Sequence, residues 1–225
     1  MAEHKDILDH GFVRLVDFMG GDLAVVQAAR VSLGKGITHT VRDKKLVDFL
    51  MANHHETPFE HSVFKFHIKC PIFVARQWFR HRMASYNEIS GRYTEMEEQL
   101  YLPERLRTQK AQNYQYQLLE EEKNRTFLQK ISRLYQETFA LYQELLENGV
   151  AKEHARIILP AALYTQFYWT INARSLMNFL ALRLDIHAQE EIRLYAKEIC
   201  RIFRQKMPWT YEAFDRYLLN NDKKP

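Results

Sequence analysis

Residues 62–93 read SVFKFHIKCPIFVARQWFRHRMASYNEISGRY, and this stretch joins a strand, a helix and a dense polar segment. From Ser62 to Lys69 apolar and polar residues alternate, which is typical of a half-buried strand. Pro71 then occupies a favourable first helical position, and the sequence predicts a helix over 72–82. The polar segment is therefore predicted to begin on a helix and to end in a loop.

Strands and helices are predicted on both sides of this stretch. Strand patterns cover residues 12–18 and 163–171, and Asp22 is predicted to cap the helix that follows the first of them. The chain is therefore predicted to form a single α+β domain over residues 1–225, with a central mixed or antiparallel sheet and long helices. The other helix patterns cover residues 44–54, 113–148, 151–159, 172–184 and 188–206.

The composition is that of a chain able to bury a full core, with 46% hydrophobic residues among 225. A net charge of +4 is too small to identify a class of partner. Cys70 and Cys200 are the only cysteines, so one chain cannot form a disulfide framework, and a reducing cytosol fits best. The longest apolar run, residues 157–164, is too short to span a bilayer. We therefore expect a soluble, cytoplasmic protein without a signal peptide or a membrane partner.

Residues 80–93 gather charged and hydrogen-bonding groups at a density that suits a multiply charged anion. A guanidinium offers five fixed donors and stays charged, so arginines around a turn make a phosphate clamp. On the predicted helix, Gln77, Arg80 and His81 fall within one arc, opposite an apolar face. A solvated basic face of an amphipathic helix is the alternative. The polar residues that continue beyond the helix weigh against it, namely Ser85, Asn87, Glu88, Ser90 and Arg92.

Metal and thiolate chemistry are less well supported. The segment HETPFEH at residues 55–61 suggests zinc ligands, but it is not an HExxH motif, and Pro58 would break a helix that carried both histidines. Thr57, Pro58 and Glu60 instead predict a capping box. Cys70 has no activating base nearby in the sequence and is predicted to be a small buried side chain. No metal site is predicted.

A nucleic-acid-binding module is the competing class of function. Trp78, Phe79, Tyr86 and Tyr93 are interleaved with the arginines and would form a stacking platform beside phosphates. The near balance of 32 basic and 28 acidic residues opposes this interpretation, as does Glu88 inside the cluster. The chain has no G-x-G-x-x-G motif and no phosphate-binding loop, so a Rossmann dinucleotide fold and a P-loop NTPase are not supported either.

The polar segment resembles the R-H-R-x-x-S-x-N-E-x-S-x-R signature of the flavin-dependent thymidylate synthases. Eight defined positions at fixed spacing make chance agreement improbable, and the resemblance extends over most of the chain, to residues 55–61, 155–156 and 172–174. The matching signature residues are Arg80, His81, Arg82, Ser85, Asn87, Glu88, Ser90 and Arg92.

The resemblance implies an enzyme that methylates deoxyuridine 5′-monophosphate (dUMP) to dTMP. The carbon donor would be 5,10-methylenetetrahydrofolate, and FAD reduced by NADPH would be the hydride source. The resemblance also implies a homotetramer with active sites shared between subunits and no nucleic-acid partner. A flavoprotein of different chemistry remains an alternative, since it would share the cofactor but not the nucleotide.

The same resemblance assigns ligand-binding residues. His55 would flank the flavin and folate rings. The residues implied to bind dUMP are Gln77, Arg80, Glu88, Ser90, Gly91, Arg92, Arg156 and Arg183. The residues implied to bind FAD are Ser32, Thr57, Arg80, His81, Arg82, Glu88, Asn172, Arg174 and Asn178.

Arg183 is a charged residue at a position where the helix pattern predicts an apolar one. It follows Leu176, Phe179 and Leu180 at helical spacing, where an apolar residue is expected. A guanidinium that faces a core must be paired, and the alternative is that it extends toward Asp185 or solvent. The resemblance makes Arg183 the catalytic group that stabilises negative charge on the uracil imide, which activates the ring carbon as a nucleophile without an enzyme thiolate.

Overall fold

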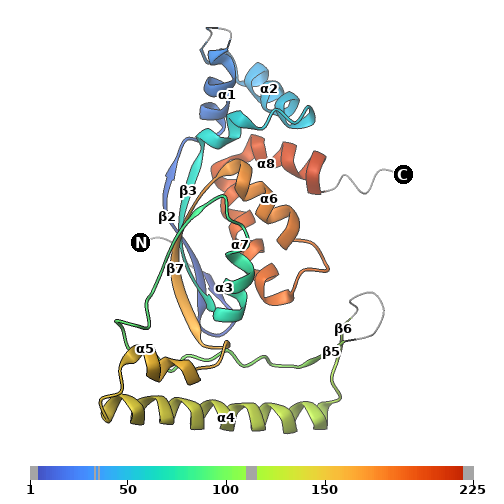
Figure 1. The fold of residues 1–225 in the computed structure, drawn as a ribbon. Helices are drawn as coiled ribbons and strands as arrows, with labels where there is room; N and C mark the ends of the chain where they lie inside the picture. Colours follow the sequence, from blue (N-terminus) through green and yellow to red (C-terminus); the bar gives the residue numbers. More distant parts are fainter. Residues whose placement is uncertain (1–4, 33, 35, 110–115, 220–225) are drawn as a thin grey trace.

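A five-stranded antiparallel sheet lies at the centre of the molecule (Figure 1). The computed structural model describes residues 5–32, 34, 36–109 and 116–219. Every strand pair in this part of the chain is antiparallel, so of the predicted mixed or antiparallel sheet, the antiparallel form is confirmed. The sheet has the order β1 (Lys5–Ile7), β2 (Gly11–Met19), β3 (Val63–Pro71), β7 (Tyr164–Asn172) and β4 (Ser85–Glu88). A separate pair consists of β5 (Arg107–Gln109) and β6 (Tyr116–Leu118).

Helices cover one side and both ends of the sheet. In Figure 1, α3, α6 and α7 lie on one side of it, α1 and α2 lie at one end, and α4 lies with α5 at the other. The helices are α1 (Asp22–Val31), α2 (Thr40–Ala52), α3 (Ile72–Trp78), α4 (Glu121–Glu147), α5 (Lys152–Ala155), α6 (Ala173–Arg183), α7 (Glu190–Lys206) and α8 (Pro208–Phe214). Shorter turns are the 3-10 helices η1 (Thr57–His61) and η2 (Arg156–Ile158) and the π-helix η3 (Asp215–Leu219).

The core forms on the helix-covered face of β3 and β7. Alternate residues of both strands are buried there, including Phe64 and Phe66 of β3 and Phe167 and Trp169 of β7. Trp78 of α3 packs edge-on against Trp169, with ring centroids 5.2 Å apart. The period of two in these strands therefore places one continuous aromatic layer between the sheet and the helices.

The antiparallel pairing of β3 with β7 sets the directions of two helices. α3 begins directly after β3 and α6 begins directly after β7, so the two helices start at opposite ends of the same strand pair. Both then run back over the helix-covered face, and their C-terminal ends approach each other. This arrangement brings the end of α3 to Arg183, the last residue of α6.

α3 is shorter than its sequence pattern. It ends at Trp78, and Arg80 and His81 lie beyond it in a turn. The prediction that these two residues share a helical face with Gln77 is therefore wrong. The helix ends because the following segment crosses to the edge of the sheet, which a continuing helix could not reach.

Residues 85–88 form strand β4 where a loop is predicted. β4 pairs with β7 over its whole length. Tyr86 stacks over Trp169 with ring centroids 6.4 Å apart, and its hydroxyl donates to the backbone oxygen of His81 at 2.7 Å. The prediction of a loop is wrong because a short polar edge strand has no hydrophobic alternation, and its partner strand lies about eighty residues away in the chain.

Asp22 does not cap its own helix. The N-cap of α1 is Gly21, which makes no side-chain capping bond. The Asp22 carboxylate instead accepts hydrogen bonds from the backbone N–H of Trp209 at 2.9 Å and from the backbone N–H of Thr210 at 3.0 Å, at the start of α8. The predicted cap is therefore wrong, because the buried N–H groups of a distant helix need this acceptor. Burial raises the pKa of Asp22.

Other helix boundaries also differ from the patterns. The helix predicted over 44–54 is α2, which begins at Thr40. The helix predicted over 113–148 is α4, which begins later because β6 occupies part of that range; residues 113–115 lie outside the described residues. The helix predicted over 151–159 divides into α5 and η2.

Gly11 lies where the sheet is closely packed, and a substitution at this position tests that packing. A Cβ atom there would lie 1.8 Å from the Tyr195 hydroxyl oxygen and 2.6 Å from the backbone oxygen of Ile7. We expect Gly11→Ala to lower the free energy of unfolding by about 1–3 kcal/mol, measured by urea denaturation, because the added methyl group displaces both neighbours. Gly36→Ala is the control, since a Cβ at Gly36 meets nothing within 4 Å. Equal stability of the two variants would contradict the packing described.

Candidate active site

Arg183 is held at the meeting point of α3 and α6. Its side chain is half-buried; Nε donates to Nε2 of His81 at 3.0 Å, and a terminal nitrogen donates to the backbone oxygen of Gln77 at 3.2 Å. The expectation that a core-facing guanidinium is paired is confirmed, but both partners are neutral groups. Within the described residues no carboxylate forms an ion pair with Arg183. Its positive charge is therefore not neutralised by this part of the chain.

The imidazole of His81 is neutral in this arrangement. Burial, and then the positive charge of Arg183, lower the pKa of His81 to about 4. Because Nε2 accepts the bond from Arg183, the ring proton lies on Nδ1. The ring also packs edge-on against Phe179, with centroids 4.9 Å apart. His81 thus holds the guanidinium without cancelling its charge.

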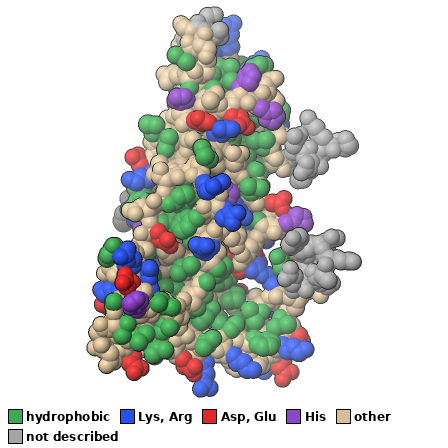
Figure 2. Space-filling model, in the orientation of Figure 1, with side chains coloured by type: hydrophobic (Ala, Val, Ile, Leu, Met, Phe, Trp, Pro, Cys, Tyr) green, Lys and Arg blue, Asp and Glu red, His purple; other side chains and the backbone are tan. Residues whose placement is uncertain are grey.

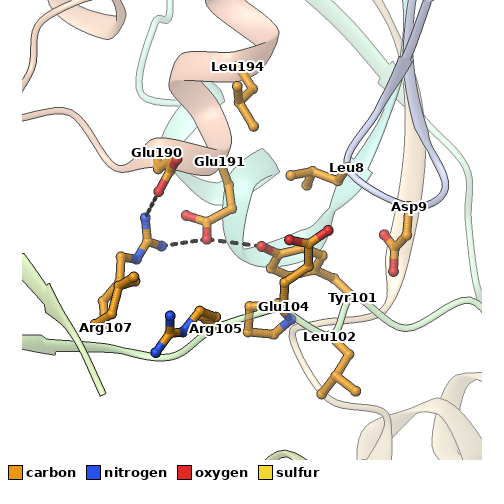
Figure 3. A pocket seen from close by; sticks show the side chains of 12 residues that line it. Leu8, Asp9, Tyr101, Leu102, Glu104, Arg105, Arg107, Glu190, Glu191 and Leu194 are labelled. Atoms are coloured by element: carbon orange, nitrogen blue, oxygen red, sulfur yellow. Dashed lines mark hydrogen bonds and ion pairs between the residues drawn. The ribbon is translucent and has the colours of Figure 1, made fainter. Parts of the chain in front are cut away.

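The side chain of Gln77 is held by a residue at the start of α7. Its amide nitrogen donates to the side-chain oxygen of Gln189, the residue before α7. Next to this contact lies a pocket of about 550 Å³ (Figure 3). In it Arg107 forms ion pairs with Glu190 at 2.8 Å and with Glu191 at 2.5 Å. These ion pairs hold the start of α7 in place and so support the contact between the two glutamines.

A second group of candidate residues lies beside α5. Gly91 is buried, and a Cβ there would lie 3.2 Å from the Cδ atom of Arg156, so a larger residue would require this arginine to shift. Arg92 is exposed and lies 3.4 Å from Glu153, while its backbone N–H donates to the Ser90 hydroxyl. The two guanidiniums and the turn form a surface suited to an anion such as a phosphate.

A third group surrounds η1 and the start of α6. Arg174 donates to Glu56 at 2.6 Å and to Glu60 at 3.0 Å, which joins η1 to α6. The side chain of Asn172 accepts from the backbone N–H of Ser175, so it caps α6. Thr57 begins η1, but the N-cap Glu56 makes no side-chain capping bond to the backbone of η1. The predicted capping box is therefore wrong, since Glu60 is occupied by Arg174 instead.

The remaining candidates line the exposed surface near these groups. Ser32 ends α1, which contacts η1, and the exposed ring of His55 lies 5.8 Å from that of Phe49. Glu88, on β4, accepts a hydrogen bond from the Thr165 hydroxyl at 2.6 Å. Three other candidates are exposed, and within the described part of the chain their side chains make no hydrogen bond or ion pair: Arg80, Arg82 and Asn178.

The candidate residues lie in separate groups within the described part of the chain. The group at Arg183 and the group at Arg156 lie on different parts of the molecule, because α5 lies with α4 at one end of the sheet and α6 does not (Figure 1). No hydrogen bond or ion pair joins these two groups in the described residues. Figure 2 shows Lys and Arg side chains gathered across the middle of one face and hydrophobic side chains exposed toward the end where α4 lies.

Several supporting residues were missed by reasoning from the sequence. Gln189, Glu56 and Thr165 each contact a candidate residue more than seventy positions away in the chain. Nothing in the local sequence indicates the first two. The position of Thr165 could have been found, because it shares the buried face of β7 with Phe167 and is polar where an apolar residue is expected.

The chain is similar to known proteins in both sequence and fold. A family model described as "Thymidylate synthase complementing protein" matches residues 14–209. A flavin-dependent thymidylate synthase from Thermosipho africanus is 54% identical over 222 residues, which cover 98% of this chain and 97% of that protein. This chain belongs to the flavin-dependent thymidylate synthase family. The family predicted from the signature is therefore confirmed.

Other members of the family show similar agreement. A flavin-dependent thymidylate synthase from Thermus thermophilus is 53% identical over 217 residues, which cover 95% of this chain and 78% of that protein. A crystal structure of the UMP/dUMP methylase PolB from Streptomyces cacaoi, bound with 5-Br dUMP, is similar in fold with a TM-score of 0.87 and 35% identity. The structural match covers 96% of this chain and 99% of the PolB chain.

The neutral imidazole of His81 can be tested by NMR titration. We expect a pKa of about 4, against an ordinary value of 6.5, and a higher value in Arg183→Ala because a nearby positive charge is removed. As the pH falls from 6.5 to about 4, the unfolded chain takes up a proton that native His81 does not, so this group lowers the free energy of unfolding in that window. Arg174→Ala, at the other end of α6, should leave the titration unchanged. A midpoint near 6.5 in the unmodified protein would contradict this interpretation.

Proposed function

We propose that this protein catalyses the reductive methylation of dUMP to dTMP, with 5,10-methylenetetrahydrofolate as the carbon donor and FAD reduced by NADPH as the hydride source. Membership of the family makes the chain a flavin-dependent methyltransferase. The observation that carries the finer proposal is the guanidinium of Arg183, half-buried and held only by neutral groups. We propose that residues 1–225 form a single domain of this family and act in the cytoplasm.

Arg183 is suited to activate the uracil ring. Attack by the ring carbon on a one-carbon unit requires negative charge to develop on the imide, and a fixed cation stabilises that charge most when water is excluded. Because His81 is neutral and no described carboxylate pairs with Arg183, the full charge of the guanidinium is available to the substrate. No enzyme nucleophile is needed, and Cys70 is buried, with burial raising the pKa of its thiol.

The group beside α5 and the group at the end of α3 together supply the charged and hydrogen-bonding side chains that a nucleotide requires. The guanidiniums of Arg92 and Arg156 flank the turn at Gly91 and suit the phosphate dianion, with Ser90 as a hydroxyl donor. We propose that these four residues bind dUMP together with Gln77, Arg80, Glu88 and Arg183.

The third group, together with Arg80 and Arg82, has the donors that a flavin dinucleotide requires. Arg80 and Arg82 have guanidiniums without a protein partner among the described residues, and Arg174 uses only two of its five donors on Glu56 and Glu60. FAD, when bound, supplies the hydride derived from NADPH. We propose that His55 flanks its ring. The residues proposed to hold FAD are Ser32, Thr57, Arg80, His81, Arg82, Glu88, Asn172, Arg174 and Asn178.

The protein is proposed to act as a homotetramer with shared active sites and without a nucleic-acid or membrane partner. Phe127, Leu134 and Leu141 are exposed on α4 at intervals of seven residues, so they form one apolar stripe along the helix. The separation of Arg156 from Arg183 also favours a site completed by a second chain. No helix in the described residues is long and apolar enough to cross a membrane.

The function can be tested with purified protein to which flavin has been added. We expect a yellow protein whose NADPH oxidation increases with dUMP and which forms dTMP when methylenetetrahydrofolate is present. Arg183→Ala should abolish turnover, lowering kcat by at least about 10³-fold, because the charge that stabilises the transition state is lost, while FAD remains bound, because every residue proposed to hold FAD is kept. Arg216→Ala, an exposed arginine on η3, is the control. Near-normal activity of Arg183→Ala would refute its assignment. A colourless protein that binds oligonucleotides with a steep salt dependence would refute the function.

Shared sites can be tested by mixing inactive subunits. Arg183→Ala and Arg92→Ala should each be inactive alone, since each lacks one part of the site. If the two residues of one site come from different chains, co-expression should restore activity in about a quarter of the sites, because half the chains supply each intact residue at random. If both residues of a site come from the same chain, every site carries a defect and the mixture stays inactive.

A further inference from the structure

The carboxylate of Glu88 is bound at the edge of the sheet by one buried hydroxyl. Thr165 is only 3% exposed, and its Oγ1 donates to Oε1 of Glu88 at 2.6 Å. This distance is in the range of a charge-assisted O–H···O⁻ bond, which is shorter and stronger than a neutral one. Within the described residues, this is the only hydrogen bond of the Glu88 side chain, so Oε2 is left for another donor.

The register of the sheet explains how the two residues meet. Glu88 pairs directly with Phe167, and Thr165 lies two residues before Phe167 on the same face. Diagonal neighbours of this kind are within reach of a long side chain. The backbone N–H of Ile89 also bonds to the oxygen of Gln166 at 2.9 Å, which keeps the register beyond the end of β4. The hydroxyl therefore approaches Glu88 from a rigid strand.

The position of Thr165 is not explained by packing. The strand positions that share its face carry Phe167, Trp169 and Ile171, which are all buried apolar residues. A valine would have the same shape and would avoid burying a hydroxyl, whose burial costs free energy unless it is hydrogen-bonded. The hydroxyl has the acceptor that it needs in Glu88, so the pair is satisfied as it stands.

We propose that Thr165 is a positioning residue, which fixes the Glu88 carboxylate so that Oε2 faces a ligand and accepts a hydrogen bond from it. This proposal rests on the proposed function, in which Glu88 borders both dUMP and FAD. Because Ser90 and Gly91 follow Glu88 within three residues, a fixed carboxylate also sets the start of the nucleotide-binding turn.

The test compares two substitutions that differ only in the hydroxyl and the methyl group. Thr165→Val removes the donor and keeps the shape, whereas Thr165→Ser keeps the donor. We expect Thr165→Val to raise the KM for dUMP or the Kd for FAD at least about fivefold with a smaller change in kcat, and Thr165→Ser to remain within about twofold of the unmodified protein. Thr170→Val is the matched control, since Thr170 lies on the other face of the same strand.

A double-mutant cycle distinguishes the proposed positioning of Glu88 from a purely structural contribution of Thr165. In a Glu88→Ala background, Thr165→Val should have little further effect on either constant, because the acceptor carboxylate is already gone. Additive effects of the two substitutions, or a Thr165→Val protein that binds both ligands normally, would overturn the proposal. If Thr165→Val does not fold, Thr165→Ala replaces it as the variant without a donor.

The same experiment distinguishes this proposal from the proposed function. Turnover by the unmodified protein tests the function, and the ratio of variant to unmodified constants tests the positioning. If the unmodified protein shows no turnover, crystal structures of Thr165→Val and Thr165→Ser decide the positioning. A Glu88 carboxylate ordered alike in both would overturn it, and one ordered only in Thr165→Ser would support it.

Discussion

The antiparallel pairing of β3 with β7 is the constraint on which the candidate site depends. The two strands pair over nine residues each, and a helix leaves the end of each one. Because the strands run in opposite directions, α3 and α6 start at opposite ends and meet at their C-termini. The buried aromatic layer, with Trp78 against Trp169, holds both helices on the same face. Without this pairing, Arg183 would not meet His81.

The meeting of these helices determines the electrostatics of the site. A half-buried arginine is usually accompanied by a carboxylate, because an isolated buried charge is costly. Here Arg183 is held by an imidazole and a backbone oxygen, and the imidazole is kept neutral by burial and by the arginine itself. Within the described residues, the fold thus maintains a positive charge that no carboxylate neutralises. Such a preorganised charge stabilises an anion that forms during a reaction.

Many features of the fold could be predicted from the amino-acid sequence. Strands with a buried face, such as β2, β3 and β7, show their period because one face must be apolar. The signature from Arg80 to Arg92 identified the family because the residue types and their spacing are fixed together. Asn172 caps the helix that begins at the next residue, which is a local interaction of the kind that a sequence pattern can indicate.

The sequence by itself determined the family, predicted a central mixed or antiparallel sheet and named the residues that are proposed to carry the chemistry. Only the tertiary structure decided where α3 ends, that residues 85–88 form a strand, and that Asp22 caps α8. It also decided that the residues of the signature from Arg80 to Arg92 lie in separate groups at different places in the folded molecule. The physical reason is that each of these features depends on a partner far away in the sequence, and local pattern carries information only about neighbours that share a helix turn or a strand face.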